Sequence, residues 1–362
     1  MNTNRVLNSR DLLAMKSYDL SSSAEANRNI AIWLLVCCTA IFGMTVLGGV
    51  TRLTGSGLSM VEWAPILGIL PPLNEAQWLE VFNLYKQSPE FIHKNFHMGL
   101  DDFKGIFWFE YAHRVLGRAI GIIFFVPMIY FIVKGHVSKS LQPKLILMFV
   151  LGGCQGLLGW YMVKSGLVND PHVSQYRLTA HLGMAFIIFA FIFWTALNLL
   201  YSKSLAVNDS LAFIRRVAVG ITAIVFITVL SGGFVAGMKA GLIYNTFPLM
   251  GDSLIPPGLF ALEPTWTNFF ENMTTVQFDH RVLATIVFIS ITSFWIMARK
   301  YELPRRAKLG INLLLATVVL QVTLGISTLL LEVPVSLGAA HQGGALVLFT
   351  VCLFTLHSLK KA

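Results

Sequence analysis

The chain has 362 residues, of which 55% are hydrophobic and only 12% are charged, and its mean hydropathy is +0.68. Soluble globular domains carry about a quarter charged residues, so this composition excludes a soluble enzyme, a disordered protein and a disulfide-rich secreted domain. The formal net charge of +9 does not indicate nucleic-acid binding, because the basic residues follow the topology of a membrane protein.

The chain opens with a polar segment, residues 1–29, which contains Asp11, Asp19 and Glu25. It predicts a cytoplasmic tail, because a signal peptide needs an apolar stretch and a mitochondrial transit peptide is poor in acidic residues. A spanning helix needs roughly 20 apolar residues. Eight stretches without Asp, Glu, Lys or Arg follow the tail: 30–51, 119–133, 145–163, 178–202, 217–238, 282–298, 309–331 and 333–359.

Two of these spans have uncertain starts. The span 119–133 is short unless its helix begins near Tyr111 and includes Arg114 and Arg118. The last span must lose residues at its start, because Pro334 favours a turn.

The distribution of charge predicts the orientation of the spans. With both termini in the cytoplasm, the inner segments hold 17 of the 27 basic residues and 5 of the 18 acidic residues. Cytoplasmic loops of membrane proteins carry such an excess of Lys and Arg. The two long loops, about 54–110 and 239–278, then lie on the outer side, and we expect any chemistry there.

The sequence also contains an internal repeat. EYAHRVLGR at 110–118 resembles QFDHRVLAT at 277–285, and TAHLGMA at 179–185 resembles AAHQGGA at 339–345. Four helices are thus followed by four similar ones of the same orientation. The sequence predicts an all-α polytopic membrane protein made of two parallel four-helix bundles, residues 30–203 and 204–362, with a pseudo-two-fold axis along the membrane normal.

Four of the nine histidines occupy equivalent positions in this repeat. His113, His181, His280 and His341 lie near the outer ends of spans 2, 4, 6 and 8. A single histidine near a helix end is usually only interfacial. Four at matched positions favour a function, because ionisable groups inside membrane bundles are costly. Imidazole is an axial ligand of haem iron, so each half is predicted to hold one haem, between His113 and His181 and between His280 and His341.

The two halves differ three residues before the first histidine of each pair. Glu110 precedes His113 on the same helical face, whereas Gln277 precedes His280. A carboxylate beside one haem and an amide beside the other indicate one reactive site and one spectator. A carboxylate can accept a proton or stabilise positive charge there. Alternatively, Glu110 is a solvated residue at a helix start, where the helix dipole favours it.

Arg114, Arg118 and Arg281 follow the paired histidines and are candidates to bind haem propionates, which are carboxylates. The alternative for each is that its side chain snorkels to the interface. His93 and His97 would suit a metal if their segment is helical, but we favour a plain loop. The four cysteines, all in apolar segments, form no Cys-x-x-Cys motif.

These motifs carry a family resemblance. Together with GGVTRLTGSGLSMVEWAPILGILPP at 48–72, they resemble the haem A synthase family from about residue 30 to 358. The lack of cysteine pairs in the outer loops resembles the proteobacterial and mitochondrial subgroup. The resemblance implies oxidation of the C8 methyl group of haem O to a formyl group, which gives haem A for cytochrome c oxidase.

The resemblance also implies roles for the two halves. The C-terminal half is expected to keep a haem B cofactor on His280 and His341, and the N-terminal half to take haem O between His113 and His181. Glu110 matches a catalytically important glutamate of the family. Two mechanisms stay open: two hydroxylations by O2 followed by loss of water, or stepwise oxidation in which water traps a carbocation at the methyl carbon. In the first account, His113 or His181 must be displaceable.

The implied partners are haem O synthase, which is a farnesyltransferase, and oxidase assembly factors, with the lipid bilayer as surroundings. The electron donor is not identified by the sequence, and a homo-oligomer is compatible with it. The expected location is the bacterial inner membrane, with the mitochondrial inner membrane as the alternative. Two other classes stay open: a di-haem b-type electron-transfer protein that acts with quinone, and a transporter, although no broken helix with a midplane ionisable group is evident.

Overall fold

The computed structural model describes residues 9–62, 69–168, 171–201 and 209–360, and these form helices without named strands. Eight of the helices are long and apolar enough to cross a membrane. They are α1 (Ser9–Leu53), α3 (Leu100–Val133), α4 (Gln142–Lys164), α5 (Gln175–Leu200), α6 (Asp209–Met238), α8 (Met273–Ala298), α9 (Arg305–Leu330) and α10 (Val335–Ser358). The predicted number of spans and the all-α class are confirmed.

Two helices begin well before their predicted spans: α1 begins at Ser9, inside the predicted tail 1–29, and α3 begins at Leu100, before the predicted start at residue 119. The helix α3 begins at Leu100, well before Tyr111, and contains Arg114 and Arg118. A search for stretches without charge misses this start, because Asp101, Asp102 and other charged residues interrupt the apolar pattern. The last span begins at Val335, directly after Pro334, as the turn-forming tendency of proline predicts.

The eight helices form two groups that meet along four helices. The helices α1, α3, α4 and α5 pack on one another, and α6, α8, α9 and α10 do the same. The groups meet where α1 packs on α10 and α5 packs on α6. Within their most apolar windows, 44% of α5 and 39% of α10 are buried, against 6% of α4. The helices α5 and α10, which carry His181 and His341, are therefore central.

The small residues of this interface allow close approach. A Cβ added to Gly233 of α6 would lie 2.8 Å from Thr179 Oγ1 of α5, and one added to Gly49 of α1 would lie 2.9 Å from Gln342 Oε1 of α10. Gln342 also donates a hydrogen bond to the carbonyl oxygen of Thr45, at 2.7 Å. Small residues and such polar contacts are the usual means of association between helices in membranes.

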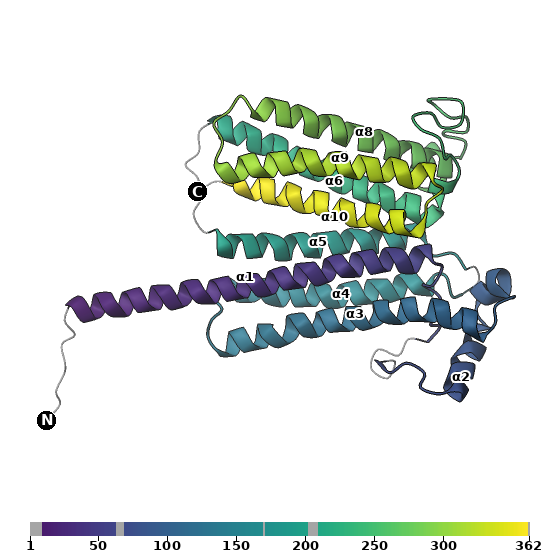
Figure 1. The fold of residues 1–362 in the computed structure, drawn as a ribbon, viewed down its shortest axis with the longest axis horizontal. Coiled ribbons are helices and arrows are strands. Elements are labelled where there is room, and N and C mark those ends of the chain that lie inside the picture. Colours follow the sequence, from purple (N-terminus) through teal and green to yellow (C-terminus); the bar gives the residue numbers. More distant parts are fainter. Residues whose placement is uncertain (1–8, 63–68, 169–170, 202–208, 361–362) are drawn as a thin grey trace.

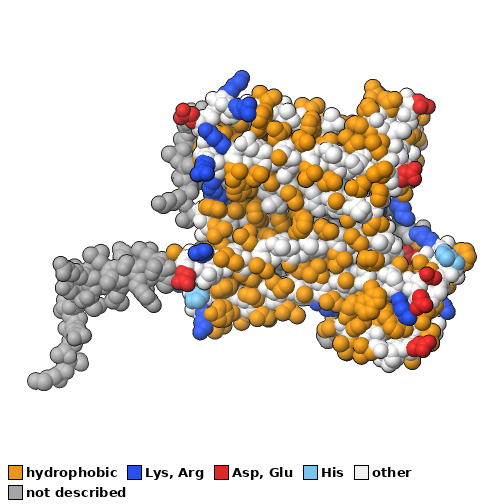
Figure 2. Space-filling model, viewed as in Figure 1, with side chains coloured by type: hydrophobic (Ala, Val, Ile, Leu, Met, Phe, Trp, Pro, Cys, Tyr) orange, Lys and Arg blue, Asp and Glu red, His pale blue; other side chains and the backbone are white. Residues whose placement is uncertain are grey.

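The ends of the helical block differ in charge. Figure 2 shows hydrophobic side chains across its middle, most Lys and Arg near the end where α10 finishes, and most Asp and Glu at the opposite end. The helix α1 enters the block at the basic end, so that both terminal helices have their chain ends on this side (Figure 1). This separation of charge is the one that the predicted orientation requires, and the cytoplasmic location of the basic end stays a prediction.

The outer segments are partly helical. The first contains α2 (Glu75–Tyr85), the π-helix η2 (Phe91–Asn95) and the first turns of α3, and the second contains η3 (Ala240–Leu242), η4 (Thr265–Thr267) and α7 (Asn268–Glu271). In the first, Phe82, Tyr85, Phe103 and Phe107 form an apolar cluster separate from the membrane core. We call the segment 75–107 the outer cap. It fixes the extension of α3 outside the spanning block.

Candidate active site

Each of the four predicted histidines lies against a glycine of a neighbouring helix. The pairs are Gly48 with His113, Gly159 with His181, Gly232 with His280, and Gly325 with His341. A Cβ on Gly325 would lie 2.8 Å from Cε1 of His341, and one on Gly159 would lie 2.9 Å from Cε1 of His181. Side chains in a packed interior leave no room for such a group, so the glycines determine where the imidazole rings can lie.

The two histidines of the C-terminal half face each other. The ring centroids of His280 and His341 are 6.5 Å apart, and the ring planes are nearly perpendicular at 86°. Two imidazoles that bind one metal ion from opposite sides, through bonds of about 2 Å, place their centroids roughly 6 Å apart. The separation therefore suits one six-coordinate iron between the rings, which is how haem is held by two histidines.

The Nδ1 atoms of this pair have polar neighbours. Ser231 Oγ lies 2.8 Å from Nδ1 of His280, and Gln321 Nε2 lies 3.2 Å from Nδ1 of His341. The Gln321 amide also donates to the carbonyl oxygen of His341 at 2.9 Å. A histidine that binds a metal through Nε2 typically donates its Nδ1–H to an acceptor, which fixes the tautomer and the ring orientation. Ser231 Oγ can accept such a bond, whereas Gln321 Nε2 can only donate and so does not provide this contact for His341.

The N-terminal pair has fewer such contacts. Gln155 Nε2 donates to the carbonyl oxygen of His181 at 2.9 Å, as Gln321 does for His341. Nδ1 of His181 is buried and has no hydrogen-bond partner in the described part of the chain. The sequence match between Gln155 and Gln321 thus corresponds to the same contact in both halves, whereas the contacts on the imidazole rings differ.

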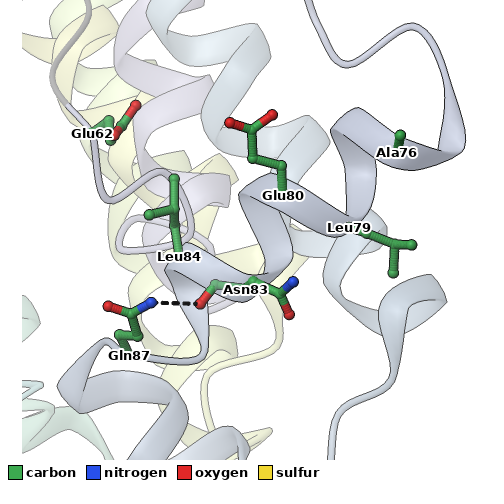
Figure 3. Close-up of a pocket in the computed structure, with 7 residues that line it drawn as sticks. All are labelled: Glu62, Ala76, Leu79, Glu80, Asn83, Leu84 and Gln87. Carbon is green, nitrogen blue, oxygen red and sulfur yellow. Dashed lines mark hydrogen bonds between the residues drawn. The ribbon is translucent and has the colours of Figure 1, made fainter.

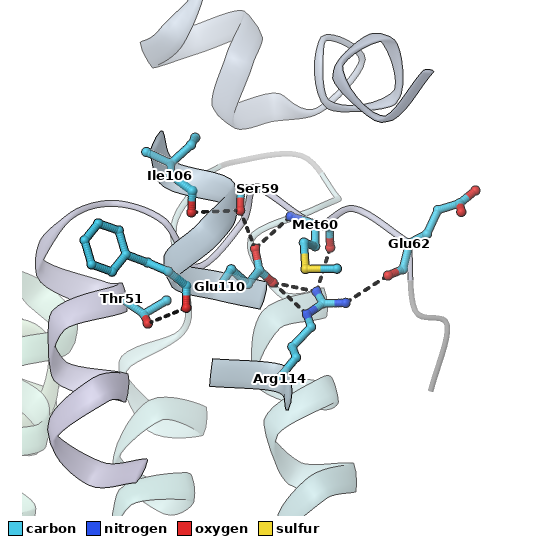
Figure 4. Close-up of polar contacts among 8 residues, drawn as sticks. Thr51, Ser59, Met60, Glu62, Ile106, Glu110 and Arg114 are labelled. Carbon is cyan, nitrogen blue, oxygen red and sulfur yellow. Dashed lines mark hydrogen bonds and ion pairs between the residues drawn. The ribbon is translucent and has the colours of Figure 1, made fainter. Parts of the chain in front are cut away.

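Glu110 lies in a dense polar network next to this pair (Figure 4). Its carboxylate is 3% exposed. Oε2 accepts hydrogen bonds from Ser59 Oγ at 2.8 Å and from the backbone N–H of Met60 at 2.7 Å. Oε1 accepts from Nε of Arg114 at 3.0 Å and from Nη2 of Arg114 at 2.5 Å. An ionised carboxylate offers about four acceptor sites, so these four donors fit its charged form.

Arg114 links Glu110 to the segment that follows α1. Its Nη2 donates to the carbonyl oxygen of Met60 at 2.6 Å, and its Nη1 donates to that of Glu62 at 2.9 Å. Arg281 does the equivalent in the other half, where it donates to the carbonyl oxygens of Tyr244 at 2.8 Å and Thr246 at 2.9 Å. Both arginines therefore hold backbone carbonyls of the outer segments.

Gln277 lies one turn before Arg281 on the same helix and is also 3% exposed. The Gln277 amide donates to the carbonyl oxygen of Tyr244 at 3.0 Å, and its Oε1 is buried without a partner in the described residues. The second half thus repeats the position of the network with an amide in place of the carboxylate. The contact of Glu110 with Arg114 is one of two salt bridges found between described residues. The Glu110 side chain is 4% exposed and the Arg114 side chain is 13% exposed.

The comparisons with known proteins agree with these motifs. The model of a family described as cytochrome oxidase assembly protein, COX15-CtaA, matches residues 31–353. The chain belongs to the COX15-CtaA family. A heme A synthase from Nitrosospira multiformis is 56% identical over 333 residues, which cover 92% of this chain and 94% of that protein. The heme A synthases COX15 of Arabidopsis thaliana and Homo sapiens are each 46% identical and cover 94% of this chain, with 77% and 84% of their own lengths matched.

Within this family member, the structure brings together most of the predicted site residues. Glu110, His113 and Arg114 lie on successive turns of α3, and His280 and Arg281 lie at the equivalent place on α8. Arg118 lies one turn beyond Arg114 and is partly buried. The binding of haem propionates by Arg114, Arg118 and Arg281 stays a prediction.

The structure also shows residues that the sequence reasoning missed. Ser59 and Met60 contact Glu110 from about 50 positions earlier in the chain. Ser231 contacts His280. In the repeat, Leu47-Gly48-Gly49 aligns with Ser231-Gly232-Gly233, so the position of Ser231 is occupied by Leu47 in the first half. The aligned repeat contains this signal, because a polar residue replaces an apolar one beside a matched glycine pair.

Other candidates lie outside the site. His93 is in η2, so its segment is helical, but among the described residues no three His, Cys, Asp or Glu side chains are placed to hold a metal ion. The four cysteines are free thiols. Figure 3 shows a cavity of about 580 Å³ lined by Glu62, Ala76, Leu79, Glu80, Asn83, Leu84 and Gln87. None of the four paired histidines lines it.

Proposed function

We propose that this chain is a haem A synthase that oxidises the C8 methyl group of haem O to a formyl group. The observation that carries the proposal is the duplicated pair of histidine sites with a carboxylate, Glu110, beside only one of them. The names of the relatives at up to 56% identity support the same activity. A single electron-transfer function gives no role to the difference between Glu110 and Gln277.

In this proposal, the C-terminal half holds haem B as a cofactor between His280 and His341. The 6.5 Å separation of the rings and the glycines behind them suit an iron with two axial imidazoles. When bound, haem B supplies one-electron redox chemistry at this site. His113 and His181 hold the substrate haem O in the N-terminal half, against Gly48 and Gly159.

Glu110 then acts as a fixed negative charge beside the substrate. Conversion of a methyl group to a formyl group removes four electrons and adds one oxygen atom, which comes from O2 or from water. In the account in which water adds, positive charge develops at the methyl carbon before the addition. A preorganised carboxylate stabilises such charge without reorganisation. Its acceptor sites already face Ser59, Met60 and Arg114, which favours this role over that of a proton acceptor.

The chain's own groups also determine the surroundings of the reaction. Arg114 holds the segment with Met60 and Glu62 over the outer end of α3, and this segment limits access of water to Glu110. We propose that Arg114, Arg118 and Arg281 lie at the propionate side of the haems.

Isotope labelling identifies the source of the oxygen atom. Label from O2 in the formyl group supports hydroxylation, and label from water supports trapping of a carbocation.

The remaining parts of the proposal concern the cellular setting. We place the protein in a bacterial inner membrane or a mitochondrial inner membrane, since the relatives include proteins from both bacteria and eukaryotes. Haem O synthase is the expected source of the substrate, and oxidase assembly factors are the expected recipients of haem A.

The test is the haem profile of purified protein co-expressed with haem O synthase, with Glu110→Gln compared with wild type and with Gln277→Ala as the matched control. Wild type should contain haem B together with haem O or haem A. Glu110→Gln should lose haem A and keep haem B, because the variant retains both histidine pairs. Haem B alone in wild type would indicate an electron-transfer cytochrome, and absence of any haem would indicate a transporter.

A further inference from the structure

The hydroxyl of Ser231 and the carbonyl oxygen of Thr228 both interact with His280, and both favour the tautomer that carries its proton on Nδ1. Ser231 Oγ lies 2.8 Å from the carbonyl oxygen of Thr228 and 2.8 Å from Nδ1 of His280. A serine hydroxyl has one proton, and a carbonyl oxygen can only accept. The proton therefore points to Thr228, and Oγ accepts a hydrogen bond from the Nδ1–H of His280. The lone pair of Nε2 is left free to bind a metal.

The equivalent position in the N-terminal half has no such group. Leu47 precedes Gly48 as Ser231 precedes Gly232, and an isobutyl side chain neither donates nor accepts a hydrogen bond. The two rings also differ by a half-turn about the bond that joins each ring to its Cβ. Nε2 of His113 is the atom nearest to a Cβ built on Gly48, at 3.0 Å, whereas Cε1 of His280 is nearest to one built on Gly232, at 3.2 Å.

The other histidine of each pair differs less between the halves. Gln155 and Gln321 donate to the carbonyl oxygens of His181 and His341, both at 2.9 Å. In both cases Cε1 is the ring atom nearest to the matched glycine. Nδ1 of His341 also lies 3.2 Å from Gln321 Nε2, whereas Nδ1 of His181 has no partner among the described residues. Because an amide nitrogen can only donate, the one side-chain oxygen found beside an Nδ1 in these two pairs is that of Ser231 at His280.

We propose that Ser231 is a positioning residue that keeps His280 fixed as a permanent haem ligand, and that Leu47 leaves His113 free to turn, so that it is the exchangeable ligand of the substrate site. The inference rests on the proposed function, in which each half takes one haem. It gives a physical reason why one of two similar sites retains its haem whereas the other must take in a substrate and release a product.

The test compares Ser231→Ala, Ser231→Thr and Thr222→Ala in the purified haem-loaded protein. Thr222 is the control, because its hydroxyl contacts only the carbonyl oxygen of Ala218 on the same helix. The readouts are the rate at which haem B transfers to excess apomyoglobin and the largest g value of the low-spin haem. Loss of a hydrogen bond on a metal-binding histidine typically lowers affinity about 10–100-fold, so transfer from Ser231→Ala should be faster by that factor.

Ser231→Thr keeps the hydroxyl, so its rate of haem B transfer and its largest g value should be close to those of wild type. The same is expected of Thr222→Ala. The mirror variant is Leu47→Ser, with Leu47→Ala as the control for lost volume. Leu47→Ser should retain product haem A at least about tenfold longer than Leu47→Ala, since the new hydroxyl can hold His113. This variant gives a readout even where Ser231→Ala fails to accumulate.

The outcomes separate the two claims. Unchanged transfer and an unchanged g value in Ser231→Ala, or equal behaviour of Leu47→Ser and Leu47→Ala, overturns the inference and leaves the synthase proposal intact. Wild-type protein that carries no haem B overturns both. Faster transfer in Ser231→Ala with rescue by Ser231→Thr supports the inference, because a merely structural serine would not change the g value.

Discussion

The two halves of the chain use one scaffold for two different environments. Both place a pair of histidines against a pair of glycines and hold an outer segment with an arginine that donates to backbone carbonyls. They differ at two positions beside the histidines: Glu110 corresponds to the uncharged Gln277, and the apolar Leu47 corresponds to the polar Ser231. In the proposed function, the shared residues bind haem in both halves, and the unmatched residues make the N-terminal half the reactive one.

The outer segments strengthen this difference. The N-terminal half carries the outer cap, in which α2 packs on the extension of α3 through Tyr85 and Phe103, with ring centroids 5.0 Å apart. The segment that contacts Glu110 lies between α1 and this cap. The second half has only the short helices η3, η4 and α7 in the equivalent place. The more elaborate cover thus lies over the half with the carboxylate.

The largest expected effect comes from removal of one histidine pair. The double variant His280→Ala with His341→Ala should lose all haem B and therefore all synthesis of haem A. The double variant His113→Ala with His181→Ala should keep haem B and bind no haem O. Extraction of haem from each purified protein checks this, and haem B that persists without His280 and His341 would contradict the assignment of the halves.

A smaller but still large effect is expected for Arg114→Gln. The substitution leaves Glu110 without its cationic partner, and breaking one side of a buried ion pair costs about 3–5 kcal/mol. The ratio of haem A to haem O should fall sharply, because the carboxylate loses the group that holds it in place. Arg281→Gln is the matched control, because the hydrogen bonds of Arg281 to described residues all go to backbone carbonyl oxygens. Equal losses in the two variants would show that Glu110 gives the first half no special role.

The glycines behind the rings provide a comparison within one helix. Gly159→Ala places a Cβ against His181, whereas Gly156→Ala, also on α4, meets nothing within 4 Å. Overpacking costs about 1–3 kcal/mol, so Gly159→Ala should weaken haem O binding about tenfold. Gly156→Ala should bind normally, since alanine is the better helix former. Titration of the purified protein with haem O measures both, and equal affinities would exclude the glycine contact as a determinant.

The smallest expected effect is a pH dependence of the outer cap. Burial raises the pKa of Glu90 to about 7, against a hydrogen bond from the Tyr85 hydroxyl that lowers the pKa. The folded state then binds more protons than the unfolded state between about pH 4 and pH 7, so stability falls as pH rises through this range. The loss is about 3–4 kcal/mol at most.

Thermal unfolding checks this dependence. Wild type should show a higher Tm at pH 5.5 than at pH 8, and Glu90→Gln should reduce the difference, because the amide stays neutral. Glu80→Gln is the matched control, since Glu80 is an exposed glutamate on α2. A Tm difference that is identical in wild type and Glu90→Gln would rule out Glu90 as its source.

Much of the fold was predictable from the sequence, because long apolar stretches and the repeat determine the eight spans. The start of α3 at Leu100 was not, since charged residues outside the membrane look like a loop in a search for uncharged stretches. Pro334 was a reliable signal, because the ring of proline cannot lie inside the preceding turn of a helix and α10 begins directly after it.

The candidate site was predictable to the level of residue types. The repeat selected Glu110 and the four histidines, because duplicated positions separate recurring residues from incidental ones. The contacts of Ser59 and Met60 with Glu110 depend on how the segment after α1 folds back over α3, which no local pattern indicates. The glycine contacts follow from the rotation of each helix about its axis, and this rotation is set by packing.

The most direct test of the central claim is an exchange of the two unmatched side chains in the double variant Glu110→Gln with Gln277→Glu. The measurement is the haem A, haem O and haem B content of the purified protein after co-expression with haem O synthase. The account predicts normal haem B, bound haem O and no haem A, because the carboxylate no longer lies beside the substrate pair. Haem A at the wild-type level would contradict the claim that Glu110 makes the N-terminal half the reactive one.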